Sequence, residues 1–526
     1  MRPLPAFPNT SVANVDQWDN FHHTITGAAV PGYLTPGEDG VAVGATLASV
    51  QTSALNAILA YCFTDPVERL CTIGARWSLS NILSPANLIL DPGIWDQMMR
   101  ADPTWSTPAY VARAQPKGGV PIIVQGGTNV RAMNNWLGKF KLALQTSGAS
   151  DGHRIAGCIA TGTHGSDLKV GAVHDTILAV YLVTGPNLGV LVQPATRWFS
   201  PAMAAWFQSQ TTIPTQDLAD DDLFNAAIVG LGGLGFVHSV VVETVPIYQL
   251  SGQTVARTLD DAAIWNAIDT LDTTALVPTP NPDFFTVVFS PYAPNGSTGA
   301  YATVLWKKPP TVPWTAPAPV PSATSTDLAR LLSALIPKID SSIDERLIGD
   351  IVADVTGTQY KAGTVAPTFP GTYFGPTTLP EGDGRSSEVI VDHANARAAI
   401  STVIQALQSE AQHGRHLLGG IGVRFVPKTT ALLGPNQAAM NTYIEFPSLD
   451  STETSAIHTA VWNALRTARI PFTCHWGQEY GMDASSIRAF FGNNVGRWMA
   501  ARARLLPTPA ARAVFTNPLL AQLDLG

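Results

Sequence analysis

The sequence predicts an α+β protein with more than one domain. The chain has 526 residues, more than a single hydrophobic core usually serves. Strand, turn and helix patterns alternate over residues 60–145, which is typical of a small α+β unit. They alternate again over residues 250–480 without a dinucleotide-binding loop, which suggests an antiparallel sheet flanked by helices. We therefore expect a first domain over residues 1–247, a second over 248–469, and a segment over 470–526 that returns to the first.

The composition excludes several classes of protein. Hydrophobic residues make up 45% of the chain and charged residues 13%, which argues against disorder. The net charge is −8 and no basic stripe is visible, so we expect neither nucleic acid nor an anionic membrane as a partner. No apolar run reaches the ~18 residues of a membrane span, and the N-terminus lacks the apolar core of a signal peptide. These features predict a cytoplasmic protein whose partner is a small molecule.

The cysteines indicate neither a metal site nor a disulfide framework. The chain has 4 cysteines, and they form no C-x-x-C pair and no cluster with histidine. Their low density also argues against a disulfide-stabilised fold. We therefore expect no metal and a reducing compartment.

The first 145 residues predict elements of both kinds. Residues 1–50 are rich in polar residues, proline and glycine and predict loops. A helical pattern follows over residues 51–63, and the apolar runs RLCTI and NLIL predict strands. VPIIVQ predicts a further strand, followed by a turn at Gly126 and Gly127 and a helix capped by Thr128 or Asn129.

Residues 151–187 are the central stretch of the first domain. Their first part is small, polar and rich in glycine, and their second part, residues 176–184, predicts a strand. Closely spaced glycines let a backbone approach a flat or phosphorylated ligand, and their N–H groups can form an anion-binding concavity. This stretch therefore predicts one wall of a cofactor cleft.

Two formal motifs compete with that interpretation. Gly230, Gly232 and Gly235 match the dinucleotide fingerprint, which must follow a strand and open a helix. Here the β-branched FVHSVVVETV follows, so we predict a glycine-rich turn between two strands instead. Residues 148–152 match G-x-S-x-G, but a hydrolase nucleophile needs a helix after it, and HRIAGCIATG is not helix-like.

The second half alternates strand and helix patterns around a proline-rich segment at residues 308–325. That segment predicts an exposed connection, with a lid over a site as the alternative. Helices are predicted over residues 258–271, 326–335, 392–412 and 452–467. Strands are predicted over residues 283–292, 300–308, 416–428, 441–448 and 470–478.

Five segments together resemble one family. They are RLCTIGARWSLSNI, IIVQGGTNVRAMNNWL, RIAGCIATGTHGSD with HDTILAVYLVTGPN, FNAAIVGLGGLGFVHSVVVET, and the final HWG at residues 475–477. In this order they resemble flavoproteins of the vanillyl-alcohol oxidase superfamily, with a PCMH-type FAD-binding domain. Within that superfamily they resemble the aldonolactone/alditol oxidase branch.

The resemblance implies an α+β fold with a two-lobed FAD-binding domain and a cap domain over the flavin ring. It also implies oxidation of a hydroxyl-bearing substrate (an alcohol, a polyol or a lactone-like compound) by hydride transfer to FAD. Oxygen or another acceptor would reoxidise the cofactor. The cofactor-binding residues that it implies are Gly74, Ala75, Arg76, Trp77, Ser78, Gly157, Thr161, Gly162, Thr163, His164, Gly165, Ser166, Gly232, Gly235 and Val237.

The first flavin loop departs from the family. Many relatives carry a histidine there that is bonded to the flavin, and the matching position here is Trp77. Tryptophan cannot form that bond, so we predict that FAD is held noncovalently. A thioether link to Cys158 is the alternative to a small buried thiol at that position.

The substrate side departs as well. Sugar-oxidising relatives have a Glu-x-Arg pair on a cap strand and a lysine after HWG or HWA; here Gly422 replaces the glutamate and Gln478 the lysine, while Arg424 remains. We expect Glu445 on a neighbouring strand to pair with Arg424 and to accept the hydroxyl proton of the substrate. A purely structural salt bridge is the alternative.

The catalytic set is completed by one histidine. His475 would contact the substrate or the flavin ring, with a buried structural histidine as the alternative, whereas His164 would shape the flavin loop. The loss of glutamate and lysine favours a less polar alcohol than a sugar lactone. An FAD-binding protein that performs a non-sugar oxidation or a cyclisation, or one that has lost its activity, is the competing function.

Overall fold

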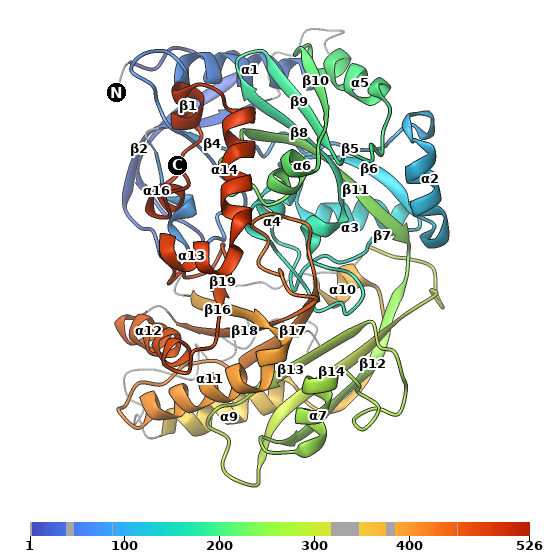
Figure 1. The fold of residues 1–526 in the computed structure, drawn as a ribbon, viewed down its shortest axis with the longest axis vertical. Coiled ribbons are helices and arrows are strands. Elements are labelled where there is room, and N and C mark those ends of the chain that lie inside the picture. The colour runs from blue at the N-terminus through green and yellow to red at the C-terminus, as the bar shows by residue number, and fades with distance from the viewer. Residues whose placement is uncertain (1–2, 38–46, 87, 317–346, 375–383, 450) are drawn as a thin grey trace.

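The structure is a computed structural model of the whole chain, and it describes residues 3–37, 47–86, 88–316, 347–374, 384–449 and 451–526. Within these residues the strands form three sheets, of four, seven and eight strands. Figure 1 shows the two smaller sheets in the upper half of the molecule and the eight-stranded sheet in the lower half. The predicted division into a two-lobed domain and a cap domain is thus confirmed, while its boundaries stay predictions.

The four-stranded sheet has the order β1-β2-β4-β3. Its strands are β1 (Thr10–Trp18), β2 (Ala28–Pro36), β3 (Leu70–Thr72) and β4 (Leu88–Leu90). The prediction of loops over the first 50 residues is therefore wrong. Strand β1 is an edge strand with mostly exposed side chains, so its polar sequence lacks the apolar alternation that marks a half-buried strand.

The seven-stranded sheet has the order β10-β9-β8-β11-β6-β5, and β7 pairs with β11. Every side chain of β8 is buried, as its apolar sequence predicts. The strands are β5 (Met98–Arg100), β6 (Val120–Gln125), β7 (Leu142–Leu144), β8 (Ile177–Gly185), β9 (Leu188–Gln193), β10 (Thr215–Ala219) and β11 (Phe236–Pro246).

Helices cover both lobes. They are α1 (Leu47–Cys62), α2 (Pro108–Ala114), α3 (Val130–Lys139), α4 (Ile155–Thr161), α5 (Pro201–Thr211) and α6 (Asp221–Ala227), with short 3-10 turns at Asn81–Leu83, Pro103–Trp105, Gln115–Lys117 and Val173–Thr176. The side chain of Asn129 accepts a hydrogen bond from the Arg131 amide, so Asn129 is the predicted cap of α3.

Four of these helices, α2, α4, α5 and α6, were not predicted. Helix α4 begins four residues after Asp151, so the statement that this stretch is not helix-like is wrong. Helix α6 precedes the glycine-rich turn where we expected a strand. The turn at residues 230–235 does lead into strand β11, as predicted, so it lacks the strand-turn-helix order of a dinucleotide-binding motif.

The eight-stranded sheet is antiparallel throughout, with the order β15-β12-β14-β13-β17-β18-β16-β19. Strand β16 was not predicted. The strands are β12 (Gln249–Thr258), β13 (Phe284–Phe289), β14 (Thr298–Lys308), β15 (Gly363–Thr368), β16 (Gly384–Asp392), β17 (Ile421–Pro427), β18 (Met440–Leu449) and β19 (Thr473–Cys474).

The main helices of this half lie on the face of the sheet that is turned away from the other two sheets (Figure 1). They are α7 (Ala262–Thr270), α9 (Ile348–Gln359), α11 (Ala396–Ala411), preceded by a turn at His393–Asn395, and α12 (Thr452–Thr467). The short α10 (Pro370–Tyr373) contacts α3 of the upper half instead. The predicted helix over residues 326–335 and the second half of the proline-rich segment, residues 317–325, lie outside the described residues.

The C-terminal helices pack against α6 and brace the glycine-rich turn before β11. They are α13 (Ala484–Phe491), α14 (Asn493–Leu505), α15 (Pro509–Val514) and α16 (Pro518–Gln522). Arg502 Nε donates to the carbonyl of Gly233 at 2.9 Å, and Asn517 Nδ2 donates to that of Leu231 at 2.8 Å. Among the described residues, no helix is both long enough and apolar enough to cross a membrane.

Candidate active site

Two adjoining cavities lie against the glycine-rich segments. The larger, of about 230 Å³, lies between the first domain and the eight-stranded sheet, and the smaller, of about 140 Å³, lies within the first domain. Both are lined by Gly74, Ser78, Leu83, Gly157 and Thr161, so they form one elongated cleft.

Bare backbone forms the walls where the two cavities meet. A Cβ atom added at Gly157 would find no atom within 4 Å, so it would project into open space. A Cβ at Gly74 would come within 3.9 Å of the Gly157 Cα atom. Glycine at both positions therefore leaves room for a flat or elongated ligand between the two lobes.

The first predicted cofactor loop lies along the larger cavity, which Ala75, Arg76 and Trp77 line together with the shared Gly74 and Ser78. The Trp77 ring stacks on Phe21, with ring centroids 5.2 Å apart, and makes an edge contact with His153 at 4.6 Å. The amide of Leu79 donates to the carbonyl of Gly477 at 2.8 Å, which fixes this loop to the predicted HWG segment.

The second predicted cofactor loop serves both domains. Gly162 ends α4 with φ +79°, and the following Thr163 and His164 line the larger cavity. Ser166 points to the eight-stranded sheet instead: its hydroxyl donates to the carbonyl of Phe285 and accepts from the Phe425 amide. Gly165 and Ser166 border a small void beside Arg424 and line neither main cavity.

The turn before β11 lines the smaller cavity. Gly232, Gly235 and Val237 face it, and residues 515–517 of the C-terminal segment close it from the other side. Gly235 has φ +120°, a conformation that strongly favours glycine. The predicted cofactor residues thus follow the cleft from end to end, except for Gly162, Gly165 and Ser166.

The eight-stranded sheet presents a row of polar side chains to the larger cavity. Gly422 of β17 lies opposite Glu445 of β18, which lies opposite Glu388 of β16. The amide of His475 donates to the Glu388 carbonyl at 3.0 Å and extends the row. Residues directly opposite in a sheet share one face, so these side chains point the same way. All of the predicted catalytic residues line this cavity: Arg424, Glu445, His475 and Gln478.

Arg424 lies between two carboxylates. Its Nη1 atom is 2.6 Å from Glu445 Oε2 and 3.2 Å from Glu388 Oε1. Glu445 Oε1 in turn accepts from Gln478 Nε2 at 2.9 Å and from the Ser386 hydroxyl at 3.2 Å. Glu445 is the outermost of the two glutamates, with 14% of its side chain exposed against 1% for Glu388.

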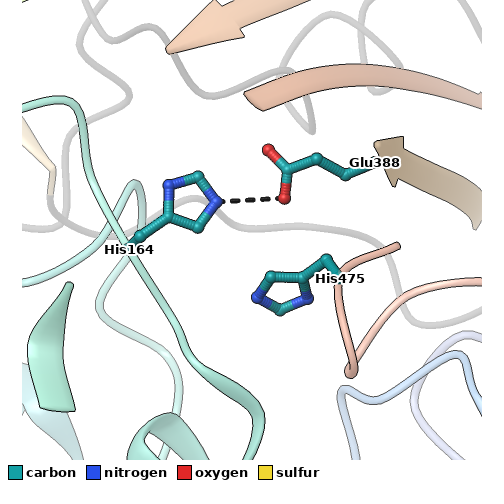
Figure 2. A group of neighbouring side chains, drawn as sticks. All are labelled: His164, Glu388 and His475. Carbon is teal, nitrogen blue, oxygen red and sulfur yellow. Dashed lines mark hydrogen bonds and ion pairs between the residues drawn. The ribbon is translucent and has the colours of Figure 1, made fainter. Parts of the chain in front are cut away.

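Glu388 also binds the cofactor loop. Its Oε2 atom is 3.0 Å from His164 Nε2, and Figure 2 shows the imidazole pointing at the carboxylate. Burial by itself raises the pKa of Glu388, but the charge and hydrogen bond of His164 and the charge of Arg424 outweigh it and lower the pKa to about 2. Glu388 is therefore a carboxylate at neutral pH.

His475 lies beside this pair (Figure 2). Burial lowers its pKa to about 4, so the ring is neutral near pH 7. Its Nδ1 atom accepts a hydrogen bond from the Gly477 amide at 3.2 Å, and the ring also bonds to the backbone of Gly162. A histidine with these contacts stiffens the segment that joins the two domains.

His164, Glu388 and His475 also place ligand atoms within 4.8 Å of one another, close enough in principle for a cation. The Arg424 guanidinium, 3.2 Å from the same carboxylate, opposes this use because it already supplies a positive charge.

Cys158, the alternative point of attachment for the flavin, is fully buried in α4 and lines neither cavity. Burial raises the pKa of its thiol to about 12.

Sequence reasoning missed several residues of the site. Glu388, Arg385 and Ser386 come from the unpredicted strand β16, and His22 and His153 line the cavity beside Trp77. The signal for β16 was present, since SSEVIVD is β-branched and alternating, but a glutamate in its middle gave no indication of a site.

Comparison with curated proteins finds relatives of one kind, although no family model matches the chain. D-arabinono-1,4-lactone oxidase of Debaryomyces hansenii is 23% identical over 186 residues, 35% of this chain and 29% of the relative. L-gulono-1,4-lactone dehydrogenase of Mycobacterium tuberculosis is 25% identical over 192 residues, 36% of each chain. The chain thus spans about a third of the length of these relatives.

Solved structures match over the whole chain. Cholesterol oxidase from B. sterolicum has a TM-score of 0.65 and 12% identity, and the match covers 99% of this chain and 100% of that one. A solvent-stable cholesterol oxidase has a TM-score of 0.63 and 11% identity over 98% and 100%. At this identity the likeness concerns the fold.

The fold is therefore that of the solved cholesterol oxidases, a mixed helix and sheet fold of the kind that the resemblance to the vanillyl-alcohol oxidase superfamily implies. Within that superfamily the sequence matches are aldonolactone oxidases and dehydrogenases, which confirms the resemblance indicated by the five segments.

Proposed function

We propose that the protein is an FAD-dependent oxidoreductase that oxidises a hydroxyl-bearing small molecule. The observation that carries the proposal is the elongated, glycine-walled cleft whose larger end meets Arg424 and Glu445 of the eight-stranded sheet. The names of the relatives, oxidases and dehydrogenases of sugar lactones and of cholesterol, support this class of reaction.

The residues of the cleft fit FAD. An extended dinucleotide needs a long cleft, a narrow passage between bare backbones and a wider end for its ring, and the two joined cavities offer these in order. Residues 74–78, Gly157, Thr161 and residues 163–164 would hold the ring and phosphates, and Gly232, Gly235 and Val237 the far end. When bound, FAD accepts the hydride, and oxygen or another acceptor takes up the electrons.

The polar side chains of the eight-stranded sheet and of the segment after it then bind the hydroxyl group of the substrate and take its proton. Glu445 faces the cavity and accepts the proton of the substrate hydroxyl as the C–H bond breaks. Arg424, held by Glu445 and Glu388, donates hydrogen bonds and stabilises negative charge that develops in the pocket. Gln478 fixes the orientation of Glu445 through its 2.9 Å hydrogen bond, and His475 contacts the ligand with the edge of its ring.

The side chains around the cavity favour a polar, uncharged substrate. Gly422 suggested a less polar alcohol, but Glu388 of β16, two strands away, places a carboxylate beside Arg424. The missing glutamate at position 422 therefore no longer favours a less polar substrate. Three of the four arginines at the cavity are paired with carboxylates: Arg424 with two glutamates, Arg385 with Glu479 at 3.1 Å, and Arg154 with Asp91 at 2.6 Å. The fourth, Arg76, donates to the carbonyl of Asp19 at 3.0 Å. A neutral polyol or lactone therefore fits better than a sterol or a carboxylate.

The function is tested by the colour of the purified protein. We expect a yellow protein with a flavin spectrum that bleaches when a neutral polyol or a sugar lactone is added without oxygen, and that recovers when an electron acceptor is admitted. A colourless protein that takes up no added FAD would refute the proposal. A yellow protein that no hydroxyl compound bleaches would favour a flavin-binding protein without oxidase activity.

FAD should be bound noncovalently. Trp77 offers no nucleophilic nitrogen, and Cys158 lies outside both cavities with a pKa raised by burial. After precipitation with acid we therefore expect the yellow colour in the supernatant, with the mass of free FAD. Flavin that stays with the pellet and adds its mass to a peptide would show a covalent link and identify the residue.

A further inference from the structure

A chain of alternating charges joins the sheet to the cofactor loop. Glu445, Arg424, Glu388 and His164 follow one another, with contacts of 2.6, 3.2 and 3.0 Å between neighbours. Three of these side chains are at most 6% exposed. Charges that deeply buried persist only where each is balanced by a partner.

The hydrogen bonds of His164 fix its protonation. Its Nδ1 atom lies 2.9 Å from the carbonyl oxygen of Gly165, and its Nε2 atom lies 3.0 Å from the Glu388 carboxylate. Both partners are acceptors. Each ring nitrogen must therefore carry a hydrogen, unless the proton shared with Glu388 lies on the carboxyl oxygen.

The shared proton belongs on the imidazole. Arg424 donates to the same carboxyl group, which favours the carboxylate over the acid. The Tyr443 ring also lies against the imidazole, with centroids 3.8 Å apart and planes 34° from each other, and an aromatic face stabilises a cation. With a protonated His164 the four groups carry no net charge.

We propose that Glu388 is a positioning residue that holds His164 as an imidazolium cation on one side and orients Arg424 on the other. The cofactor loop then carries a fixed positive charge at the edge of the larger cavity, which His164 lines. That this positive charge lies beside a bound cofactor rests on the proposed function, whereas the ion pair between His164 and Glu388 does not.

The surroundings contain other titratable groups, and they do not replace this partner. The groups that face His164 from the packed elements are Glu388 of β16, Arg424 of β17, Tyr443 of β18, His475 after β19 and His174 of the turn before β8. Glu388 is the acidic member of this set. Burial keeps His475 neutral, with a pKa of about 4, and also lowers the pKa of His174.

The experiment measures directly whether each ring nitrogen of His164 carries a proton. In protein labelled with ¹⁵N-histidine, we expect both His164 nitrogens to give signals of the protonated kind at roughly pH 7.5, where an unpaired histidine is neutral. His164→Gln assigns the signals. In Glu388→Gln, one of the two signals should move to the unprotonated kind, because the amide offers no charge to balance the cation.

A matched control lies elsewhere in the chain. His458 makes the same two types of contact, to the carboxylate of Glu479 and to the carbonyl of Phe446. Glu479→Gln should therefore change the signals of His458 and leave those of His164 unchanged. Glu445→Gln should leave both histidines unchanged, since Glu388 remains.

A second readout follows Arg424. If Glu388→Gln folds, we expect kcat to fall by up to about 10²-fold because Arg424 loses one of the partners that orient it. An unprotonated nitrogen on His164 in the unaltered protein would overturn the proposal, even where the variant does not fold. The nitrogen signals require no turnover, so a protein that oxidises nothing would refute the proposed function and leave this ion pair untouched.

Discussion

Glutamine in place of Glu445 should lower kcat by about 10²- to 10⁴-fold while the protein keeps its FAD. The amide has nearly the same size as the carboxylate, and it can still bond to Arg424 through its oxygen. What it lacks is the ability to take the proton of the substrate hydroxyl. The hydrogen bonds of Glu445 go to Arg424, Gln478 and Ser386 and not to the predicted cofactor residues, so binding of FAD should not change.

The measurement compares anaerobic bleaching rates of the variant and of the unaltered protein, after the FAD content of each has been determined from absorbance. Gln478→Ala is the matched control, because it removes one hydrogen bond to Glu445 and keeps the carboxylate. That control should lose much less activity than Glu445→Gln. Full turnover in Glu445→Gln would show that the pair with Arg424 is only a structural salt bridge.

The residues of the site that could be predicted are those that belong to a motif within one continuous segment of the chain. Residues 74–78, the turn at 232–235 and Gly157 of α4 carry their glycines in the sequence, and the structure places them along one cleft. Arg424 was recognisable because GIGVRF resembles the strand on which relatives carry a Glu-x-Arg pair, of which this chain keeps the arginine. Each of these motifs lies within one continuous segment, so it can be recognised without knowing which strands and helices become neighbours in the fold.

Glu388 could not be found in this way. It reaches Arg424 only because β16 lies beside β18, and β18 beside β17, an order that no pattern within β16 specifies. A shift of one residue in the register would turn its carboxylate to the other face. The same holds for β1, whose exposed sequence is organised by pairing with β2.

Helix α4 was missed for a different reason. Gly157 and the β-branched Ile155, Ile159 and Thr161 give this segment low helix propensity. Its helix is held by the tertiary structure, because Ile155, Cys158 and Ile159 are fully buried on one side. Gly162 in the left-handed conformation at its end was the signal available, since glycine commonly stops a helix there.

Methionine in place of Arg424 should have the largest effect on stability and activity together. It removes the cation that lies between Glu388 and Glu445 and leaves two carboxylates facing each other in a largely buried site. Breaking a buried ion pair from one side typically costs about 3–5 kcal/mol. The loss of a donor to developing negative charge should lower kcat by about 10²- to 10³-fold among the molecules that remain folded.

A double variant separates the two effects. Arg424→Met combined with Glu445→Gln removes one of the facing carboxylates, so it should unfold at a higher denaturant concentration than Arg424→Met alone. Its activity should not recover, because both the cation and the base are then missing. If the double variant were instead no more stable than the single one, repulsion between the two glutamates would not be the cause of the instability. Arg424→Lys keeps a charge but not the planar guanidinium, so it should retain more stability than activity.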